Sequence, residues 1–368
     1  MNPQPTLLEL LGLSWPLKAP ARAVAWAADD ATLACAQDEG LLVLADGVWA
    51  QGPSLGERPG GGVAVVAAQA PAAEPRPVRA HPGACRALRA DRAGGFLSGG
   101  DDGRLVHTST AGSCAQLVLQ AGQPVVAVES GANGVRAWAS VRQVHRRRAQ
   151  QQQRVQESIE PPAPVAALAF NPAGDCLAIA HAGGITLWAG DSTTRLLACA
   201  GDVTTLAWSA DGKHLAGLTA QGVMQGWRSA DGQALALPGQ SGDLHCLAFG
   251  GGGRFVVVGG AARPLAWRID SNADNEPPVV CGAASKAAVT QLACHPALAV
   301  VAAGFGNGAI ALSQPGSADV LVVRNAGDGA VSALAWSGDG SRLAFATNGT
   351  QDKAFGWVKL PQALFRSP

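Results

Sequence analysis

The chain has 368 residues, of which 48% are hydrophobic and 15% charged, with 47 glycines and 23 prolines. It is too apolar for a disordered chain and too rich in glycine for a helical bundle, so the composition favours many short strands joined by turns. The 27 basic and 27 acidic residues balance, which argues against a dedicated nucleic-acid binder because such proteins carry a basic excess. No apolar stretch approaches the length of a membrane-spanning helix.

The N-terminal residues contain a short apolar run without a preceding basic region, so we interpret them as mature fold rather than as a signal peptide. The segment LSWPLKAP (13–20) has the character of an outer β-strand. Two later stretches, near 47–82 and 144–164, are predicted to be loop insertions. The first is rich in Gly, Pro and Ala, and the second is polar and ends in prolines.

Along the chain one phrase recurs, consisting of a short apolar strand, a turn rich in Gly and Asp, and a second apolar strand. Clear copies are VAALAFNPAGDCLAIAH (165–181), VTTLAWSADGKHLAGLT (203–219), LHCLAFGGGGRFVVVGG (244–260) and VSALAWSGDGSRLAFAT (331–347). Weaker copies begin near 21, 85, 125 and 289. The copies align on Trp26, Ala90, Ser130, Phe170, Trp208, Phe249, Cys294 and Trp336, and after the first they are about 41 residues apart. A third strand follows each copy, and most have a fourth apolar run, which is the period of a propeller blade.

These residues resemble the WD40-repeat family of β-propellers over about residues 21–360. The most specific features are the hairpin SADGKHLA (209–216), the run SGGDDGRLV (98–106), and tryptophan at the end of the third strand at 188, 227, 267 and 357. The sequence departs from the family because no Trp-Asp dipeptide follows these strands, and the opening Gly-His survives only as Ala80-His81. We expect these tryptophans in the core between blades, and the family's buried His–Ser–Asp–Trp network to be largely missing.

We therefore predict an all-β protein, a single closed propeller over residues 1–368 with eight four-stranded blades, or seven as the alternative. The last copy runs out of chain after its third strand, so the N-terminal segment 13–20 is expected to complete that blade and close the ring. Closure removes the exposed sheet edges of an open ring.

Candidate chemical sites are weak. The pairs His245-Cys246 and Cys294-His295 fall at different repeat positions and show no metal-ligand spacing. The run Arg146–Arg148 is interpreted as a solvated loop. The first residues of the inner strands, expected around the channel, are apolar: Val125, Val165, Val203, Leu244, Val289 and Val331. We expect no catalytic residue, metal or cofactor.

The eight cysteines contain no CxxC pair and favour a reduced, cytoplasmic protein, and the excess of arginine over lysine is typical of a GC-rich, bacterial-type genome. The resemblance implies a non-enzymatic scaffold that binds other proteins through loops on one face. The alternative is a propeller enzyme or metal-dependent hydrolase at the central channel. We expect a monomeric propeller with unidentified protein partners and neither nucleic acid nor membrane as a partner. The candidate binding residues lie in the turns between second and third strands: Asp38, Glu39, Asp101, Asp102, His181, Gln221, Arg263, Asn307, Asp352 and Lys353.

Overall fold

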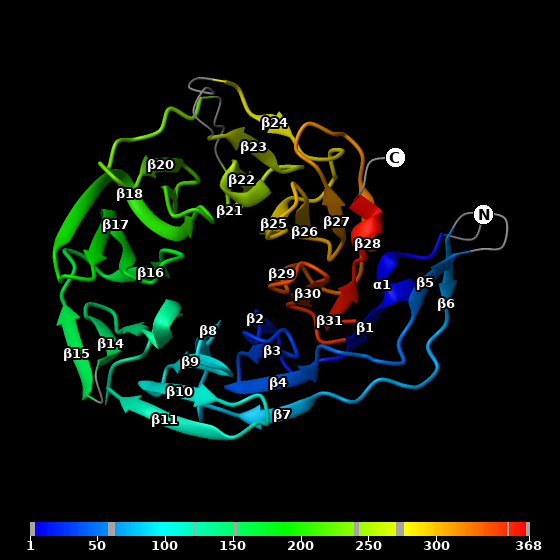
Figure 1. The fold of residues 1–368 in the computed structure, drawn as a ribbon, viewed down its shortest axis with the longest axis horizontal. Coiled ribbons are helices and arrows are strands. Elements are labelled where there is room, and N and C mark those ends of the chain that lie inside the picture. Colours follow the sequence, from blue (N-terminus) through cyan, green and yellow to red (C-terminus); the bar gives the residue numbers. More distant parts are fainter. Residues whose placement is uncertain are drawn as a thin grey trace.

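The computed structural model of the chain is a closed ring of antiparallel sheets around a central channel (Figure 1). The structure describes residues 4–57, 63–120, 122–150, 153–238, 243–269, 276–351 and 353–365. Each repeat places its first strand next to the channel and stacks its later strands outward. Within the described residues, no helix has the length and apolar character needed to cross a membrane.

The first three repeats each form a four-stranded sheet. The first sheet comprises β2 (Ala21–Trp26), β3 (Thr32–Gln37), β4 (Leu41–Asp46) and β7 (Arg76–Arg79). The second comprises β8 (Cys85–Ala90), β9 (Phe96–Gly100), β10 (Arg104–Thr108) and β11 (Cys114–Leu119). The third comprises β12 (Ala127–Ser130), β13 (Arg136–Ala139), β14 (Val144–Gln150) and β15 (Gln153–Ile159).

The fourth and fifth repeats share one connected sheet of five strands. Its members are β16 (Val165–Phe170), β17 (Cys176–Ala189), β18 (Thr194–Trp208), β19 (His214–Thr219) and β20 (Met224–Arg228). The first part of β18 pairs with β17 and its last part pairs with β19, so this strand passes from one repeat into the next. Gly201, at a φ of 122°, lies where the two parts meet. The fifth repeat's outer strand is reduced to a bridge between Trp227 and Ala234.

The last three repeats again form four-stranded sheets. One comprises β21 (Cys246–Gly250), β22 (Phe255–Gly259), β23 (Leu265–Arg268) and β24 (Val279–Val280). The next comprises β25 (Val289–Cys294), β26 (Val301–Phe305), β27 (Ile310–Ser313) and β28 (Leu321–Arg324). The last comprises β29 (Val331–Trp336), β30 (Arg342–Thr347), β31 (Phe355–Lys359) and the N-terminal β1 (Gly12–Trp15). Short 3-10 helices are η1 (Ala132–Gly134), η2 (Gly251–Gly253) and η3 (Gln362–Phe365).

The number of blades depends on this shared strand. Counted as connected sheets, the blades in the described residues number seven, which is the alternative that the sequence left open. The eight repeats nevertheless all take part in the ring, and buried apolar clusters lie at all eight contacts between successive repeats. The closed β-propeller is confirmed, and eight separate four-stranded sheets are corrected to eight repeats in seven sheets.

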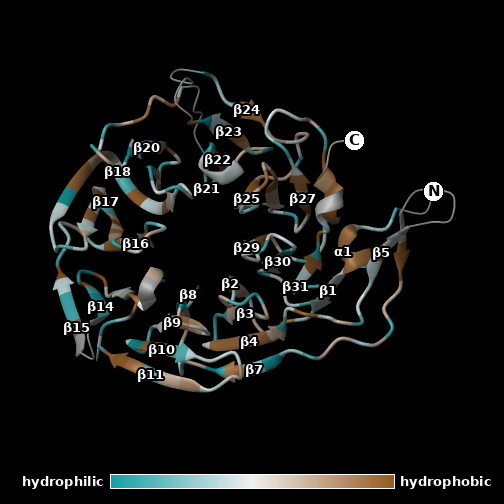
Figure 2. Cartoon of the chain, in the orientation of Figure 1, coloured by the Kyte–Doolittle hydropathy of each residue, from teal (hydrophilic) through white to brown (hydrophobic). Residues whose placement is uncertain are grey.

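The stretch 144–164 is not a loop, contrary to the sequence interpretation. Residues 144–150 and 153–159 form the two outer strands β14 and β15, which pair in register from Val144 opposite Ile159 to Gln150 opposite Gln153. These strands are largely hydrophilic, as Figure 2 shows, and so lack the apolar alternation by which a strand is recognised in the sequence. An outer strand forms by backbone pairing and does not need that alternation. The basic run is also not simply solvated: the Arg146 side chain is 2% exposed and donates to the carbonyl of Ala189 at 2.8 Å.

The stretch 47–82 is partly an excursion from the ring. It contains the hairpin β5 (Ser54–Glu57) and β6 (Val63–Val66), a separate two-stranded sheet. The hairpin lies beside the N-terminal helix α1 (Leu7–Leu11), outside the ring in Figure 1. The end of the stretch returns as β7, which pairs with β4 and completes the first sheet.

The tryptophans at the ends of the third strands lie in the core, as the repeat pattern predicted. Trp188, Trp227, Trp267 and Trp357 are each at most 3% exposed and belong to the clusters between neighbouring repeats. A second set was not foreseen: tryptophans at the end of inner strands donate to the preceding inner strand. Trp26 Nε1 donates to Ala335 O, Trp208 Nε1 to Ala169 O, and Trp336 Nε1 to Ala293 O, at 3.0 to 3.1 Å.

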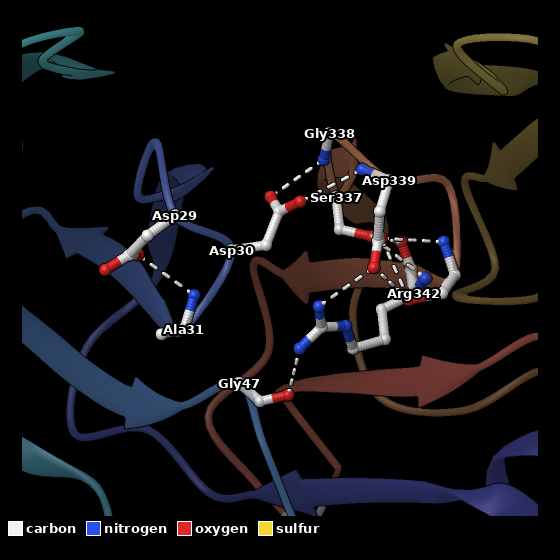
Figure 3. A network of polar contacts seen from close by, with 9 residues as sticks. Asp29, Asp30, Ala31, Gly47, Ser337, Gly338, Asp339 and Arg342 are labelled. Atoms are coloured by element: carbon white, nitrogen blue, oxygen red, sulfur yellow. Dashed lines mark hydrogen bonds and ion pairs between the residues drawn. The ribbon is translucent and has the colours of Figure 1, made fainter.

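The ring closes where the first and last repeats meet, and the N-terminal strand completes the last sheet as predicted. β1 pairs with β31 from Gly12 opposite Val358 to Trp15 opposite Phe355. Figure 3 shows the polar part of this junction, in which Asp30 accepts from the N–H groups of Gly338 (2.7 Å) and Asp339 (2.9 Å). We call the contact between these two repeats the closing junction.

The ring has two distinct faces. Antiparallel pairing places the start of each inner strand beside the turn between the second and third strands, as where Val331 pairs with Thr347. We call this side the turn face. The end of each inner strand and the turn that follows it, such as residues 337–341, lie on the opposite face.

Candidate interaction surface at the channel mouth

A repeated bulge shapes the channel mouth on the turn face. In six inner strands the pairing register shifts across the second residue, so that residue has no partner in the ladder. A bulge re-aims its side chain. The six bulged residues are Arg22, Arg86, Ala166, Thr204, Thr290 and Ser332. Four of them, from the first, second, fourth and fifth repeats, line a cavity of about 330 Å³ at the mouth.

The apolar first residues of the inner strands do not line the channel, contrary to the expectation. Val125, Val203 and Val289 are fully buried and belong to the clusters between repeats. For Val203 and Val289 the bulge explains the difference, because it turns the next residue toward the mouth and leaves the first residue under the neighbouring sheet. The rim is therefore more polar than the sequence pattern suggested.

The charged residues among the six bulged positions are Arg22 and Arg86, in the first two repeats. Arg22 donates to Asp38, and Arg86 donates to both carboxylate oxygens of Asp101 at 2.5 and 3.1 Å. These four side chains are between 37% and 49% exposed. Exposed pairs of this kind contribute less than about 1 kcal/mol each to stability, so they orient the side chains more than they hold the fold together.

Asp102 is a structural residue and not an exposed turn residue. Its carboxylate bonds Nδ1 of His81 at 3.0 Å, and Nε2 of His81 bonds the hydroxyl of Ser98 at 2.9 Å. Burial lowers the pKa of His81 in spite of the opposing effect of Asp102. The His–Ser–Asp part of the network expected to be largely missing is thus retained in the second repeat, where Thr108 stands at the register position of Trp227.

His181 is likewise not available on the surface. Its side chain is buried, and Nε2 bonds Thr186 Oγ1 at 2.9 Å while Nδ1 faces the carbonyl of Ala182 at 2.9 Å. Both contacts are within its own repeat. A turn position in the sequence does not reveal this burial, because β17 runs through the turn into the third strand.

The remaining predicted residues lie around the turn face. Glu39, Gln221, Asn307 and Lys353 are exposed, and Arg263 is half-buried. Lys353 Nζ donates to Glu9 Oε1 at 3.0 Å, which joins the turn face to the N-terminal segment. Asp352 lies outside the described residues.

A buried polar cluster that the sequence reasoning missed lies between the second and third repeats. Ser130 Oγ donates to Asp91 Oδ1 at 3.0 Å, and Arg136 approaches Asp91 Oδ2 at 2.6 Å. His107 Nε2 is 3.7 Å from the same carboxylate. Asp91 lies between the serine and the histidine, so no histidine is placed to activate the hydroxyl as in a hydrolase triad. Only the presence of Asp at the turn could have pointed to it.

The chemistry available to an enzyme at the channel is limited in the part of the chain that the structure describes. No group of three or more His, Cys, Asp or Glu side chains there could hold a metal ion. The residues that line the 330 Å³ cavity include three arginines, Arg22, Arg86 and Arg89, and neither carboxylates nor histidines. The geometry instead offers positively charged and hydroxyl-bearing groups for recognition.

Comparison with known proteins identifies the fold. No protein-family model and no curated protein matches the sequence. The crystal structure of the computationally designed Ika8 protein is similar, with a TM-score of 0.69 and 17% identity over 94% of this chain and 98% of that chain. The structure of U3-55K and the crystal structure of the RRP9 WD40 repeats each give a TM-score of 0.58, at 14% and 13% identity, over 95% of this chain and 98% of theirs. The chain therefore has the fold of WD40-repeat β-propellers.

Proposed function

We propose that this protein is a non-enzymatic scaffold that binds other proteins through the turn face, around the channel mouth. The observation that carries the proposal is the ring of bulged residues, which presents different side chains on one rim of an otherwise regular fold. The first two repeats offer arginine–aspartate pairs, and the fourth, fifth and seventh place Ala166, Thr204 and Thr290 at the equivalent position. A rigid scaffold with varied side chains on one rim is suited to recognition.

Charge and burial narrow the binding residues. Asp102 and His181 serve the fold, so of the candidate acidic residues that the structure describes, Asp38, Glu39 and Asp101 are accessible to a partner. A basic segment of the partner would compete with Arg22 and Arg86 for these carboxylates, which costs little because the pairs are exposed. We further propose a monomeric protein of a bacterial cytoplasm, which the eight free thiols support.

Affinity purification from the native cell, followed by titration of the recovered protein, tests the proposal. The triple variant Asp38→Lys, Glu39→Lys and Asp101→Lys is expected to keep its melting temperature within a few degrees and to weaken binding by about tenfold or more at low salt, because charge complementarity is lost. Asp231→Lys, at an exposed carboxylate on the opposite face, is the matched control. Full affinity of the folded triple variant at low and moderate salt would exclude this face, and recovery of no partner would count against the scaffold itself.

A further inference from the structure

One position of the inner strands is nearly uniform around the ring. The residue before the alignment position of each repeat is alanine in six repeats: Ala25, Ala169, Ala207, Ala248, Ala293 and Ala335. In the second and third repeats it is Arg89 and Glu129, whose side chains form an ion pair at 3.2 Å. A ring of small side chains is thus interrupted by a single charged pair on one wall.

The same wall carries arginines from one mouth to the other. Arg86, Arg89 and Arg92 follow one another along the second repeat's inner strand and the turn after it. Arg86 and Arg89 line the cavity at the turn face, whereas Arg92 and Glu129 line a second cavity of about 460 Å³ on the opposite face. None of the residues assigned to binding under the proposed function lines this second cavity.

The wall facing Arg92 is apolar and rigid. It is formed by Phe170, Pro172, Leu206 and Trp208 from the fourth and fifth repeats. The indole of Trp208 is held in place because Nε1 donates to Ala169 O at 3.1 Å. Phe170 and Trp208 are half-buried, so part of each ring remains open to a ligand.

Arg92 is the unpaired charge of this cavity. Glu129 is taken by Arg89, and Asp91 is buried with Arg136 and Ser130. Among the described residues the Arg92 guanidinium has neither an ion-pair nor a hydrogen-bond partner, although its main-chain N–H donates to Ser130 Oγ at 2.9 Å. Asp29, which lines a neighbouring cavity with Arg92, accepts from the N–H of Ala31. An exposed guanidinium beside fixed aromatic rings matches a carboxylate next to an apolar side chain.

We propose that this cavity binds an extended protein segment in which an aspartate or glutamate lies within two positions of an aromatic, leucine or proline residue. The carboxylate pairs with Arg92, and the apolar side chain packs on Trp208 and Phe170. This is a second binding site, on the face opposite to the one assigned under the proposed function, and it does not depend on that assignment.

Selection of a displayed library of random dodecapeptides on the full-length protein tests the site. We expect the wild type to enrich peptides with an acidic residue next to an apolar one. For a synthetic peptide of the enriched sequence, Arg92→Glu should weaken binding by about tenfold or more, Arg92→Lys should weaken it less, and changing the peptide's acidic residue to its amide should match the Arg92→Glu loss. Phe170→Ala should also weaken binding, with folding checked by circular dichroism.

Arg22→Glu, at the other mouth of the channel, is the matched control and should leave the peptide affinity unchanged. A peptide in which lysine replaces the acidic residue should bind Arg92→Glu better than it binds the wild type, which would directly support the contact between Arg92 and that residue. The proposal is overturned if the wild type enriches no acidic–apolar motif, if Arg92→Glu leaves the affinity unchanged, or if Arg22→Glu weakens it equally. Each of these outcomes is independent of the charge-reversal experiment on the turn face.

Discussion

Two contacts between neighbouring repeats differ in what holds them together. The closing junction combines strand pairing, indole hydrogen bonds and charged groups: Trp26 donates to Ala335 O, Trp357 Nε1 donates to Asp46 O at 3.1 Å, and Arg342 donates to Gly47 O at 2.5 Å. The guanidinium of Arg342 also lies 5.1 Å from the centre of the Trp26 ring. Polar and aromatic contacts thus reach across the junction at several points.

The contact between the β21–β24 and β25–β28 sheets is built from small side chains. Its buried cluster contains Cys246, Cys281, Val257, Ala303 and similar residues, with Cys294 packed against it. The side chain of Val289, the first residue of the next inner strand, packs against Gly259. Here the chain runs directly from one sheet to the next. The polar contacts at the outer edge come from the backbone: Gly282 N–H donates to Ser317 O at 2.7 Å, and Gly316 N–H donates to Val280 O at 2.8 Å. At the closing junction the chain does not continue, and the sheet that β1 shares with β31 replaces the covalent connection.

Removal of residues 1–20, which disrupts the closing junction, is expected to cause the largest loss of stability. It deletes β1 together with four buried side chains, Leu8, Leu11, Trp15 and Leu17. Burial of one such side chain contributes about 1.5 to 3 kcal/mol, so the free energy of unfolding should fall by about 6 kcal/mol or more. Chemical denaturation measures the loss. Replacing the β5–β6 hairpin with a short linker is the control and should cost far less, because Leu55 is the only one of its described residues that packs against a core cluster. Equal losses would argue against closure by β1.

Trp26→Ala and Cys294→Ala compare the same repeat position at the two junctions. Trp26 is 6% exposed and donates across the junction, so its truncation should cost about 3 to 5 kcal/mol. The cysteine loses only a sulfur atom from a contact of small residues, and a loss of about 1 kcal/mol is expected. Thermal denaturation of both variants gives the ranking, and a larger loss for Cys294→Ala would reverse our view of the two junctions.

Gly259→Ala probes the close packing of the second junction. An added Cβ would lie 2.5 Å from Val289 Cγ1 and 3.0 Å from Cys246 Sγ, so overpacking should cost about 1 to 3 kcal/mol. At the closing junction Gly338→Ala meets only the flexible Asp30 carboxylate at 3.2 Å and should be nearly neutral. The urea midpoints of unfolding of the two variants test this expectation. If Gly259→Ala leaves the midpoint unchanged, the two sheets can move apart at this point at little cost.

Asp30→Ala removes the carboxylate that accepts from Gly338 and Asp339 across the closing junction. Two backbone N–H groups lose their partner, but both can reach water, so the loss should be about 1 to 2 kcal/mol. Asp30→Asn keeps one acceptor oxygen and should retain part of the stability. If both variants unfold at the same urea concentration as the wild type, this contact does not contribute to closure.

The smallest effect is expected from pH. Burial opposes ionisation of Asp339, but hydrogen bonds from Ser337 and Ser341 outweigh it and lower the pKa to about 2. A lowered pKa in the folded state stabilises the protein above the unfolded value near 4 and loses this contribution as pH falls toward 2. The melting temperature of Asp339→Asn should therefore vary less between pH 5 and pH 2 than that of the wild type. An unchanged slope would remove Asp339 from the acid sensitivity of the closing junction.

The sequence by itself determined the repeats, the turns and the residues that form the core. Alternating apolar residues, the tryptophans at 188, 227, 267 and 357, and the missing last strand could be recognised because each follows from the period of a strand or of the repeat. Closure by the N-terminal strand followed from the same count. These features depend on local order along the chain, which the sequence displays directly.

Only the tertiary structure decided which polar residues are buried and which are exposed on the two faces. Asp102 and His181 occupy turn positions in the sequence but are held inside by His81 and Thr186. Arg22 and Arg86 reach the channel mouth because bulges re-aim them, and Arg92 meets Trp208 only because the ring brings distant repeats around one channel. The physical reason is that burial and pairing depend on what the neighbouring sheet covers, and that neighbour lies tens of residues away along the chain.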